Sequence, residues 1–280
     1  MKKILCLVMA LTMMLALCAC GASEAPAAPA ANDSAYPTVV AGKLTVATSP
    51  DFAPYEFYAI GADGKPVLAG FDIALAGYIA NHLGLELEII PMDFDGVLNE
   101  LAAGSVDLGV AGLSPDPARM ESMDFSDIYY EGGQAFVTVK GSEGKFPTLA
   151  DANKAEFTIG AQNGSIQMDL ANENTPDADI VALVKVTDII AELMGGKLDG
   201  AFIETAVAVN YAQNYPELVV LHDVPYEAEG SAVGVIKGNE ALLKGVNEAI
   251  AAALADGSMD KFVAEANELS TGEIIEGLID

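Results

Sequence analysis

The stretch that decides the fold is residues 100–107, ELAAGSVD, together with its counterpart at 192–199, ELMGGKLD. In both, a helix end meets a glycine, which favours the left-handed conformation that stops helices, and a strand follows. A second pair of segments, KLTVA at 43–47 and EFTIG at 156–160, has the pattern of strands. Copies roughly a hundred residues apart are too distant for solenoid repeats. They favour two similar α/β lobes, although helix–glycine–strand is a common order in α/β proteins generally.

Strand-like and helix-like segments alternate from residue 43 onward. Helices are expected at 71–83 and 94–103, ended by Gly84 and Gly104, and strands at 44–47, 85–90 and 106–111. Such alternation predicts an α/β fold with a largely parallel sheet.

Two later extended segments, 132–140 and 230–237, are candidates for strands that cross between the lobes. The chain would then leave the first lobe, build the second and return, and helices within 239–266 would complete the first lobe. Ligands of open α/β sheets bind at the carboxyl ends of strands. These ends would face the cleft between the lobes.

The N-terminal residues 1–19 have the pattern of an export signal, with two lysines followed by an apolar run that is short for a membrane span. The run ends in LCACG at 17–21, which resembles a bacterial lipobox. By that resemblance Cys20 would carry the lipid, and residues 20–42 would form a flexible tether. The alternative is an ordinary secretory signal cleaved near Ala19 or Ala22. Both place the domain outside the cytoplasm, and the first anchors it to the membrane.

Composition excludes several classes of function. The 280 residues hold 41 acidic and 13 basic side chains, a net charge of −28, which argues against a nucleic-acid partner. Three cysteines and two histidines leave little material for a metal site. No nucleophile elbow, phosphate loop or dinucleotide fingerprint occurs. We therefore expect no metal, no cofactor and no enzymatic activity.

Arg119 is the only arginine of the chain. Its guanidinium offers a rigid fork for a carboxylate, which a lysine cannot imitate. Asp116 and Pro117 suit the start of a helix, so Arg119 is expected in its first turn. The alternative is that Arg119 pairs with one of the many surface carboxylates.

Five ordered motifs carry a resemblance to a known family. They are SPDFAPYEF at 49–57, GFDIALA at 70–76, GLSPDPAR at 112–119 with MDFS and YY after it, DGAFIE at 199–204 and ADGS at 255–258. Together they resemble the extracytoplasmic amino-acid-binding proteins of ABC importers, from about residue 43 to 269. The resemblance implies an α/β, two-lobed type II periplasmic-binding fold with two hinge strands. The lobes would be 43–132 with 230–280, and 133–229.

The resemblance also implies the binding residues. Arg119 would hold the ligand α-carboxylate, helped by Ser114 and the backbone near Gly112. Phe52 would stack on the ligand side chain, with Phe94 on the opposite wall. The loop at 163–167, with Ser165 and Gln167, would open a helix whose free N–H groups approach the carboxylate. Glu204 would accept the α-ammonium.

Three departures from the family pattern bear on the ligand. Ser49 stands where many members that bind basic or amide side chains have Asp. Ile166 replaces a usual hydroxyl residue, and Glu204 is one methylene longer than the usual Asp. We therefore expect a free amino acid with a neutral or polar side chain.

The resemblance implies a monomer that works with ABC permease subunits and reaches the membrane through its lipid anchor. One alternative is an exported dehydratase-like enzyme, since a few relatives catalyse such reactions; Glu204 or Asp51 could then serve as the acid. The other is a component that presents its ligand to a separate membrane sensor.

Overall fold

The structure is a computed structural model that describes residues 35–227 and 230–271. The predictions for the signal peptide at 1–19 and for Cys20 lie outside the described residues, as does most of the predicted tether.

The first sheet has the strand order β5-β1-β6-β13-β7. Its strands are β1 (Lys43–Thr48), β5 (Glu86–Pro91), β6 (Leu108–Gly109), β7 (Met123–Tyr130) and β13 (Ser231–Ile236). β1 pairs in parallel with β5 and β6, whereas β13 runs antiparallel to β6 and β7. The helices that pack with this sheet are α2 (Phe71–Leu83), α3 (Phe94–Ala102) and α7 (Glu240–Ala255), and α8 (Ser258–Ser270) packs on α2 and α7.

The second sheet has the order β10-β9-β11-β8-β12. Its strands are β8 (Gln134–Val139), β9 (Thr158–Gln162), β10 (Asp179–Leu183), β11 (Gly200–Glu204) and β12 (Leu218–Asp223). β9 pairs in parallel with β10 and β11, and β8 runs antiparallel to β11 and β12. Its helices are α4 (Ile166–Asn174), α5 (Val186–Met194) and α6 (Thr205–Asn214).

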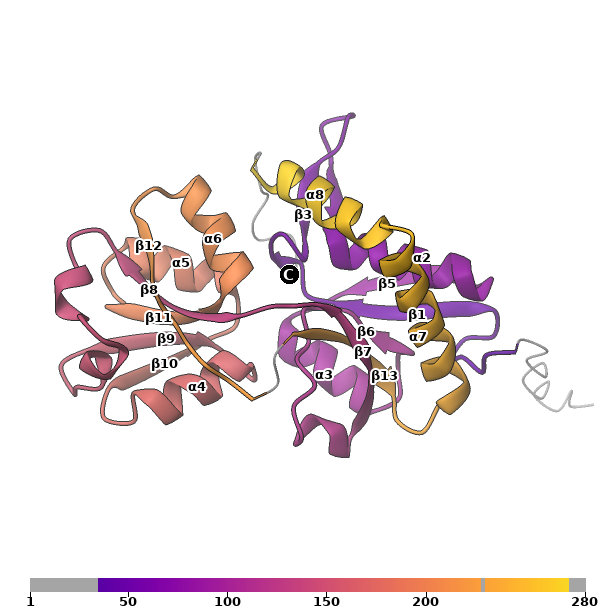
Figure 1. Ribbon diagram of the computed structural model, residues 1–280, viewed down its shortest axis with the longest axis horizontal. Helices are drawn as coiled ribbons and strands as arrows, with labels where there is room; N and C mark the ends of the chain where they lie inside the picture. Colours follow the sequence, from indigo (N-terminus) through magenta and orange to yellow (C-terminus); the bar gives the residue numbers. More distant parts are fainter. Residues whose placement is uncertain (1–34, 228–229, 272–280) are drawn as a thin grey trace, which may run out of the picture. The chain divides into compact units, whose positions relative to one another are not determined.

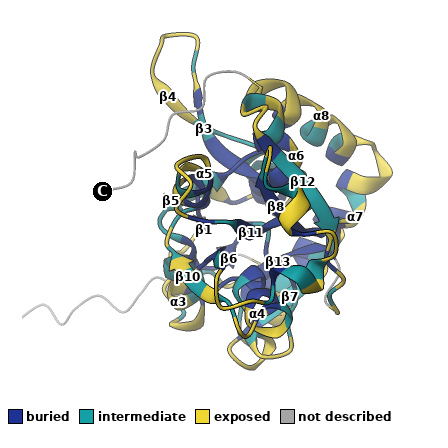
Figure 2. Cartoon of the chain, turned by 90° about the vertical axis from the view of Figure 1, so that its left-hand side faces the viewer, coloured by how far each residue is buried: buried dark blue, intermediate teal, exposed yellow. Residues whose placement is uncertain are grey.

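The chain passes from the first sheet to the second between β7 and β8 and returns between β12 and β13 (Figure 1). A small third sheet of β2 (Asp51–Phe52), β3 (Glu56–Ile60) and β4 (Pro66–Ala69) follows β1. Figure 2 shows that central strands such as β1, β11 and β13 are buried, while the edge strands are only partly buried and α7 and α8 expose their outer faces. One apolar cluster includes residues of both large sheets, with Phe52 and Tyr55 among its members. Phe52 of the small sheet and Tyr55 of the loop that follows it therefore belong to the same core as the two larger sheets, whereas Phe57 of β3 packs in a separate small cluster with Ala53 and Ala59.

The repeated sequence segments make matching contacts in the two sheets. After α3, Gly104 has φ +72°, and the Ser105 amide donates to the Glu100 carbonyl at 2.9 Å. After α5, Gly196 has φ +70°, and the Lys197 amide donates to the Glu192 carbonyl, also at 2.9 Å. The same helix stop is thus built twice.

The aspartate that ends each repeat joins it to the other repeated segment. Asp107 accepts the Thr45 amide at 2.8 Å and the Thr45 hydroxyl at 2.6 Å. Asp199 accepts the Thr158 amide at 3.1 Å. Each carboxylate thereby anchors one strand of its own sheet, β1 for Asp107 and β9 for Asp199. The two repeated segments of each sheet are therefore also in contact in space.

The predicted helix α2 is confirmed residue for residue, and Gly84 ends it with φ +68°. The predicted helix at Asp116 is wrong, because only the short 3-10 helix Arg119–Glu121 forms there. Strand β7 begins at Met123, so the chain has no room for a second turn. The predicted strand at 106–111 pairs only over Leu108–Gly109.

Candidate functional site

Gly112 begins the loop that carries the predicted carboxylate-binding residues. Its φ of +56° favours glycine, and a Cβ atom there would lie 2.9 Å from Cε1 of Phe52. Its amide donates to the Asp72 carboxylate at 2.8 Å. The Gly112 amide is therefore engaged within the protein, and the part that Gly112 plays in the site is close packing against Phe52.

Arg119 joins loops that belong to the two different sheets. Its Nη1 donates to the Ser114 carbonyl and its Nη2 to the Gly164 carbonyl, both at 3.2 Å. The guanidinium carbon lies 5.6 Å from the centre of the Phe94 ring. Ser114 and Phe94 are both buried. Two of the predicted binding residues, Ser114 and Phe94, therefore lie around the guanidinium of a third, Arg119.

The charge of Arg119 is not matched by a close carboxylate. Among the described residues, no acidic group lies within 4.0 Å of it, so the surface ion pair that the sequence left open does not form. Burial lowers the pKa of Arg119, while Asp116 and Asp169 act against this. The two hydrogen bonds to carbonyls use two of the five guanidinium N–H groups. The remaining N–H groups of the Arg119 guanidinium can donate hydrogen bonds to an anionic ligand.

Ser165 caps the helix of the second-lobe loop. Its hydroxyl accepts the Met168 amide at 3.2 Å and donates to the Gln162 carbonyl at 2.7 Å. The amides of Ile166 and Gln167 are the first two of α4 and have no acceptor within the helix. These amides, rather than the Ser165 hydroxyl, are the groups with which the loop can contact an anion.

The Gln167 side chain donates to the Gln134 side chain of β8 at 2.7 Å, and both are buried. Gln134 was not predicted from the sequence. No local pattern marks it, because its contact joins two segments that are far apart in the chain.

Glu204 ends β11 and caps α6. Its carboxylate accepts the amides of Val207 at 2.8 Å and Gly133 at 3.3 Å, and only 3% of the residue is exposed. Burial raises the pKa of Glu204 to about 7, against hydrogen bonds from Val207, Gly133 and the Tyr55 hydroxyl. The carboxylate lies beneath the segment that joins the two sheets. It can accept a cation there, and it titrates near neutrality.

Asp51 makes a contact between the sheets that the sequence did not predict. Its carboxylate accepts the Val186 amide of α5 at 2.6 Å, the Gln162 side chain at 3.3 Å and the Ser49 hydroxyl at 2.8 Å. The N-cap residue of α5, Lys185, makes no side-chain cap hydrogen bond. Asp51 therefore caps α5 from a segment far away in the sequence.

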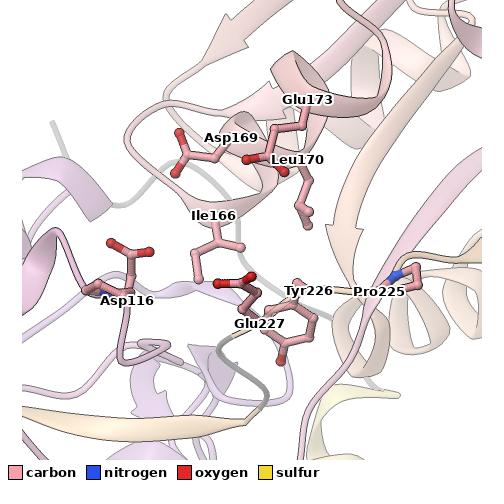
Figure 3. Close-up of a pocket in the computed structure, with 9 residues that line it drawn as sticks. Asp116, Ile166, Asp169, Leu170, Glu173, Pro225, Tyr226 and Glu227 are labelled. Carbon is pink, nitrogen blue, oxygen red and sulfur yellow. The ribbon is translucent and has the colours of Figure 1, made fainter.

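A pocket of about 320 Å³ lies beside this region (Figure 3). Its lining residues are Asp116, Pro117, Ile166, Asp169, Leu170, Glu173, Pro225, Tyr226 and Glu227. Asp116 belongs to the same loop as Arg119, and Ile166 opens α4. Of the residues predicted for binding, none lines this pocket. Its four carboxylates make it unfavourable for an anion.

No cluster of His, Cys, Asp and Glu suited to a metal ion occurs within residues 35–227 and 230–271. In the same part of the chain, no helix has both the length and the apolar character needed to cross a membrane.

Comparison with known families identifies the chain. The sequence profile of the bacterial extracellular solute-binding proteins, family 3, matches residues 44–266. The chain belongs to this family. The fold is accordingly the two-lobed type II periplasmic-binding fold, and the family description locates the protein outside the cytoplasm.

Two relatives resemble this family member over nearly its full length. The arginine-binding extracellular protein ArtP of Bacillus subtilis is 31% identical over 265 residues, which cover 93% of this chain and 96% of ArtP. A probable histidine-binding protein of Neisseria gonorrhoeae is 33% identical, with 90% of each chain covered. Both names describe binding proteins rather than enzymes.

A solved structure and an enzyme complete the comparison. An amino acid ABC transporter substrate-binding protein of Streptococcus pneumoniae bound to L-arginine has a TM-score of 0.77 and 35% identity, covering 81% of this chain and 95% of that one. A cyclohexadienyl dehydratase of Pseudomonas aeruginosa is 27% identical over 205 residues, 73% of this chain and 75% of the enzyme.

Proposed function

We propose that this solute-binding protein captures a free amino acid between its lobes and delivers it to the permease of an ABC importer. The observation that carries the proposal is Arg119, the sole guanidinium, which bridges the two lobes without a close carboxylate among the described residues. A lipid on Cys20 would keep the protein near the permease, and one copy suffices for the site.

The orientation that we propose for the bound amino acid follows from the charges of the ligand and of the site. The α-carboxylate would lie against Arg119 and Ser114, close to the free amides that begin α4. The α-ammonium would lie against Glu204. The rings of Phe52 and Phe94 are both largely buried, at 8% exposure each, and would cover the side chain. Each charge of the zwitterion is then paired as closure removes water.

We further propose a preference for neutral or polar side chains. Ser49 provides a hydroxyl rather than a carboxylate, and its hydroxyl donates to Asp51 at 2.8 Å. The Asp51 carboxylate already accepts three hydrogen bonds. A cationic side chain would find little unused acceptor capacity there. Because several relatives bind arginine by name, arginine is the competitor that decides the question.

Calorimetric titration with single amino acids tests both proposals. We expect 1:1 binding with a micromolar dissociation constant, about −8 kcal/mol, for a neutral or polar amino acid such as glutamine. The amide and the N-acetyl derivative of the same amino acid, which each lack one charge, should bind far more weakly. Equal binding of these derivatives would refute the pose. If arginine bound more tightly than every neutral or polar amino acid, the proposed side-chain preference would be wrong, but the proposed orientation of the ligand would not be affected.

The enzymatic alternative has one observation in its favour, the similarity to a dehydratase. Glu204 and Asp51 are the acids that such chemistry would use, since burial raises their pKa values to about 7 and about 6. Incubation with hydroxy acids, followed by chromatography, separates the two functions. Turnover would favour the enzyme, and stoichiometric retention without product would favour the binding protein.

A further inference from the structure

Two carboxyl groups lie together in the core behind Phe52 and Gly112. Glu56 is the first residue of β3, and Asp72 lies in the first turn of α2. Both residues have 0% exposure. The Asp72 amide donates to the Tyr55 carbonyl at 2.9 Å, which brings the helix start against the small sheet. Neither side chain is part of the proposed ligand contacts.

Hydrogen bonding distinguishes the two acids. Asp72 accepts the Gly112 amide at 2.8 Å and the Tyr129 hydroxyl at 2.7 Å, so its negative charge is stabilised. Neither carboxyl oxygen of Glu56 accepts a hydrogen bond of ordinary distance and angle from the described residues. A buried ionised carboxylate without donors is very unfavourable. With a proton on Glu56, its contact with Asp72 becomes a hydrogen bond that Glu56 donates.

The surrounding charges point the same way. The titratable groups that act on this pair are Asp51 of the small sheet, Tyr129 of β7 and Tyr55 of the loop between β2 and β3. All of them are acids, and no lysine, arginine or histidine acts on either Glu56 or Asp72. Ionisation of both carboxyl groups would therefore place two uncompensated charges side by side.

We propose that Glu56 stays protonated in the folded protein from pH 5 to pH 8 and donates a hydrogen bond to the Asp72 carboxylate. Through Asp72, this hydrogen bond positions the loop that begins at Gly112. The pair joins three segments, because Asp72 also binds Gly112 and Tyr129. Gly112 in turn contacts Phe52 and begins the loop that ends at Arg119. The effect on ligand binding rests on the function proposed above, whereas the protonation does not.

The pKa values agree with this geometry. Burial, followed by the charges of Asp72 and Asp51, raises the pKa of Glu56 well above its ordinary 4.5. The backbone of Ser49 acts weakly in the other direction without forming a hydrogen bond of ordinary geometry. Burial also raises the pKa of Asp72, to about 6, against its hydrogen bonds. A group whose pKa is raised on folding stabilises the protein fully below its unfolded pKa, and this stabilisation is lost as the pH rises. The protonation of Glu56 is thus maintained at the expense of stability above pH 4.5.

The first test is thermal unfolding of the ligand-free protein between pH 5 and pH 8.5. Glu56→Gln carries a neutral donor of the same shape, so it should melt at least about 4 °C above wild type at pH 8. The difference should shrink towards pH 5. Glu100→Gln, on the exposed face of α3, is the matched control and should follow wild type. A Glu56→Gln curve that lies below wild type or parallel to it would overturn the protonation.

A second measurement covers the case in which Glu56→Gln does not fold. In wild type, the ¹³C resonance of the Glu56 carboxyl group should keep its protonated position from pH 5 to pH 8. A midpoint below pH 8 would contradict the proposal. This experiment, like the first, needs no ligand, so its outcome is independent of whether the protein binds amino acids.

The positioning role is tested with the amino acid that binds best in calorimetry. Glu56→Gln should bind within about twofold of wild type at pH 7.5. Asp72→Asn should bind at least about tenfold more weakly, because one amide oxygen replaces the two that serve Gly112 and Tyr129. Unchanged binding by Asp72→Asn would refute the positioning. If Asp72→Asn does not fold, NMR of the wild-type protein provides the test. The chemical shift of the Gly112 amide proton should change with a midpoint near pH 6, as Asp72 ionises. A chemical shift that does not change with pH would refute the positioning role.

Discussion

At the scale of single residues, Arg119 indicates which kind of ligand group the site can bind. The chain has twelve lysines for surface charge, and its one arginine lies in the loop that follows β6. A guanidinium can bind two carbonyls and still offer parallel donors to a carboxylate, which an ammonium cannot. The structure places it between the two lobes, where a ligand carboxylate would contact both.

Replacing Arg119 by alanine should weaken binding by about 2–5 kcal/mol, because the ligand carboxylate would be buried without its partner. Arg119→Lys should recover only part of this, since lysine cannot form the bidentate pair. Lys65→Ala, which removes an exposed lysine whose ion-pair partner is Asp63, is the control. Calorimetry with the best ligand measures all three. Binding by Arg119→Ala within threefold of wild type would contradict the assignment.

Glu204 makes binding depend on pH. Burial raises its pKa to about 7, and an ammonium binds the ionised form, so binding releases a proton below pH 7. The affinity should therefore rise with pH, by up to about tenfold per unit below pH 7, and level off above it. Titrations from pH 5.5 to pH 8.5 measure this. Glu204→Gln should bind the amino acid weakly, and its affinity should not depend on pH in this range. If the affinity of the variant still rises with pH, another group causes the dependence.

At the scale of elements, the start of α2 holds the small sheet in place. Gly70 precedes the helix with φ +121°, and a Cβ atom there would overlap the Tyr55 carbonyl. Gly77, in the same helix, has no atom within 4 Å of such a Cβ. The tertiary structure therefore requires the glycine that precedes this helix but not the glycine inside it.

These two glycines should respond oppositely to alanine. Gly70→Ala should destabilise the protein by about 3 kcal/mol or more, through backbone strain and the steric overlap. Gly77→Ala should stabilise it by about 0.5–1 kcal/mol, because glycine is unfavourable inside a helix. Chemical denaturation of both variants measures the changes. A loss of stability in Gly77→Ala would show that its surroundings are tighter than described.

At the scale of the whole molecule, charge couples stability to pH. Burial raises the pKa values of Asp51 and Asp72 to about 6 and that of Glu204 to about 7. At these three positions the folded chain therefore binds protons more tightly than the unfolded chain. The stabilisation from these protons is complete below the unfolded pKa values near 4 and is lost as the pH rises through 6–7. The net charge of −28 adds repulsion that favours unfolding in the same direction.

The ligand-free protein should accordingly melt at a higher temperature at pH 5.5 than at pH 8. Sodium chloride at 0.5 M separates the two causes, because salt screens the repulsion between surface charges but not the protonation of buried groups. Melting curves at both pH values and both salt concentrations should show a smaller but persistent difference in high salt. A melting temperature that rises from pH 5.5 to pH 8 would contradict the raised pKa values.

Local patterns in the sequence predicted much of this structure. α2 forms over the expected residues, and Gly104 and Gly196 stop their helices in the same way. These features depend on neighbours within a few positions, so the chain reveals them directly. The helix expected at Asp116 failed because its signals were local, whereas its length is limited by β7, which pairs with β13 from the far end of the sequence.

The sequence by itself determined the α/β alternation, the duplicated helix stops and the presence of a single guanidinium. Only the tertiary structure decided which partners the polar groups obtain. It turned the Gly112 amide towards Asp72, used the Ser165 hydroxyl as a helix cap and brought Asp51 to α5. It also buried Glu56 beside Asp72. These outcomes follow from contacts between segments that lie far apart in the chain, and from the loss of water around them, neither of which a local pattern encodes.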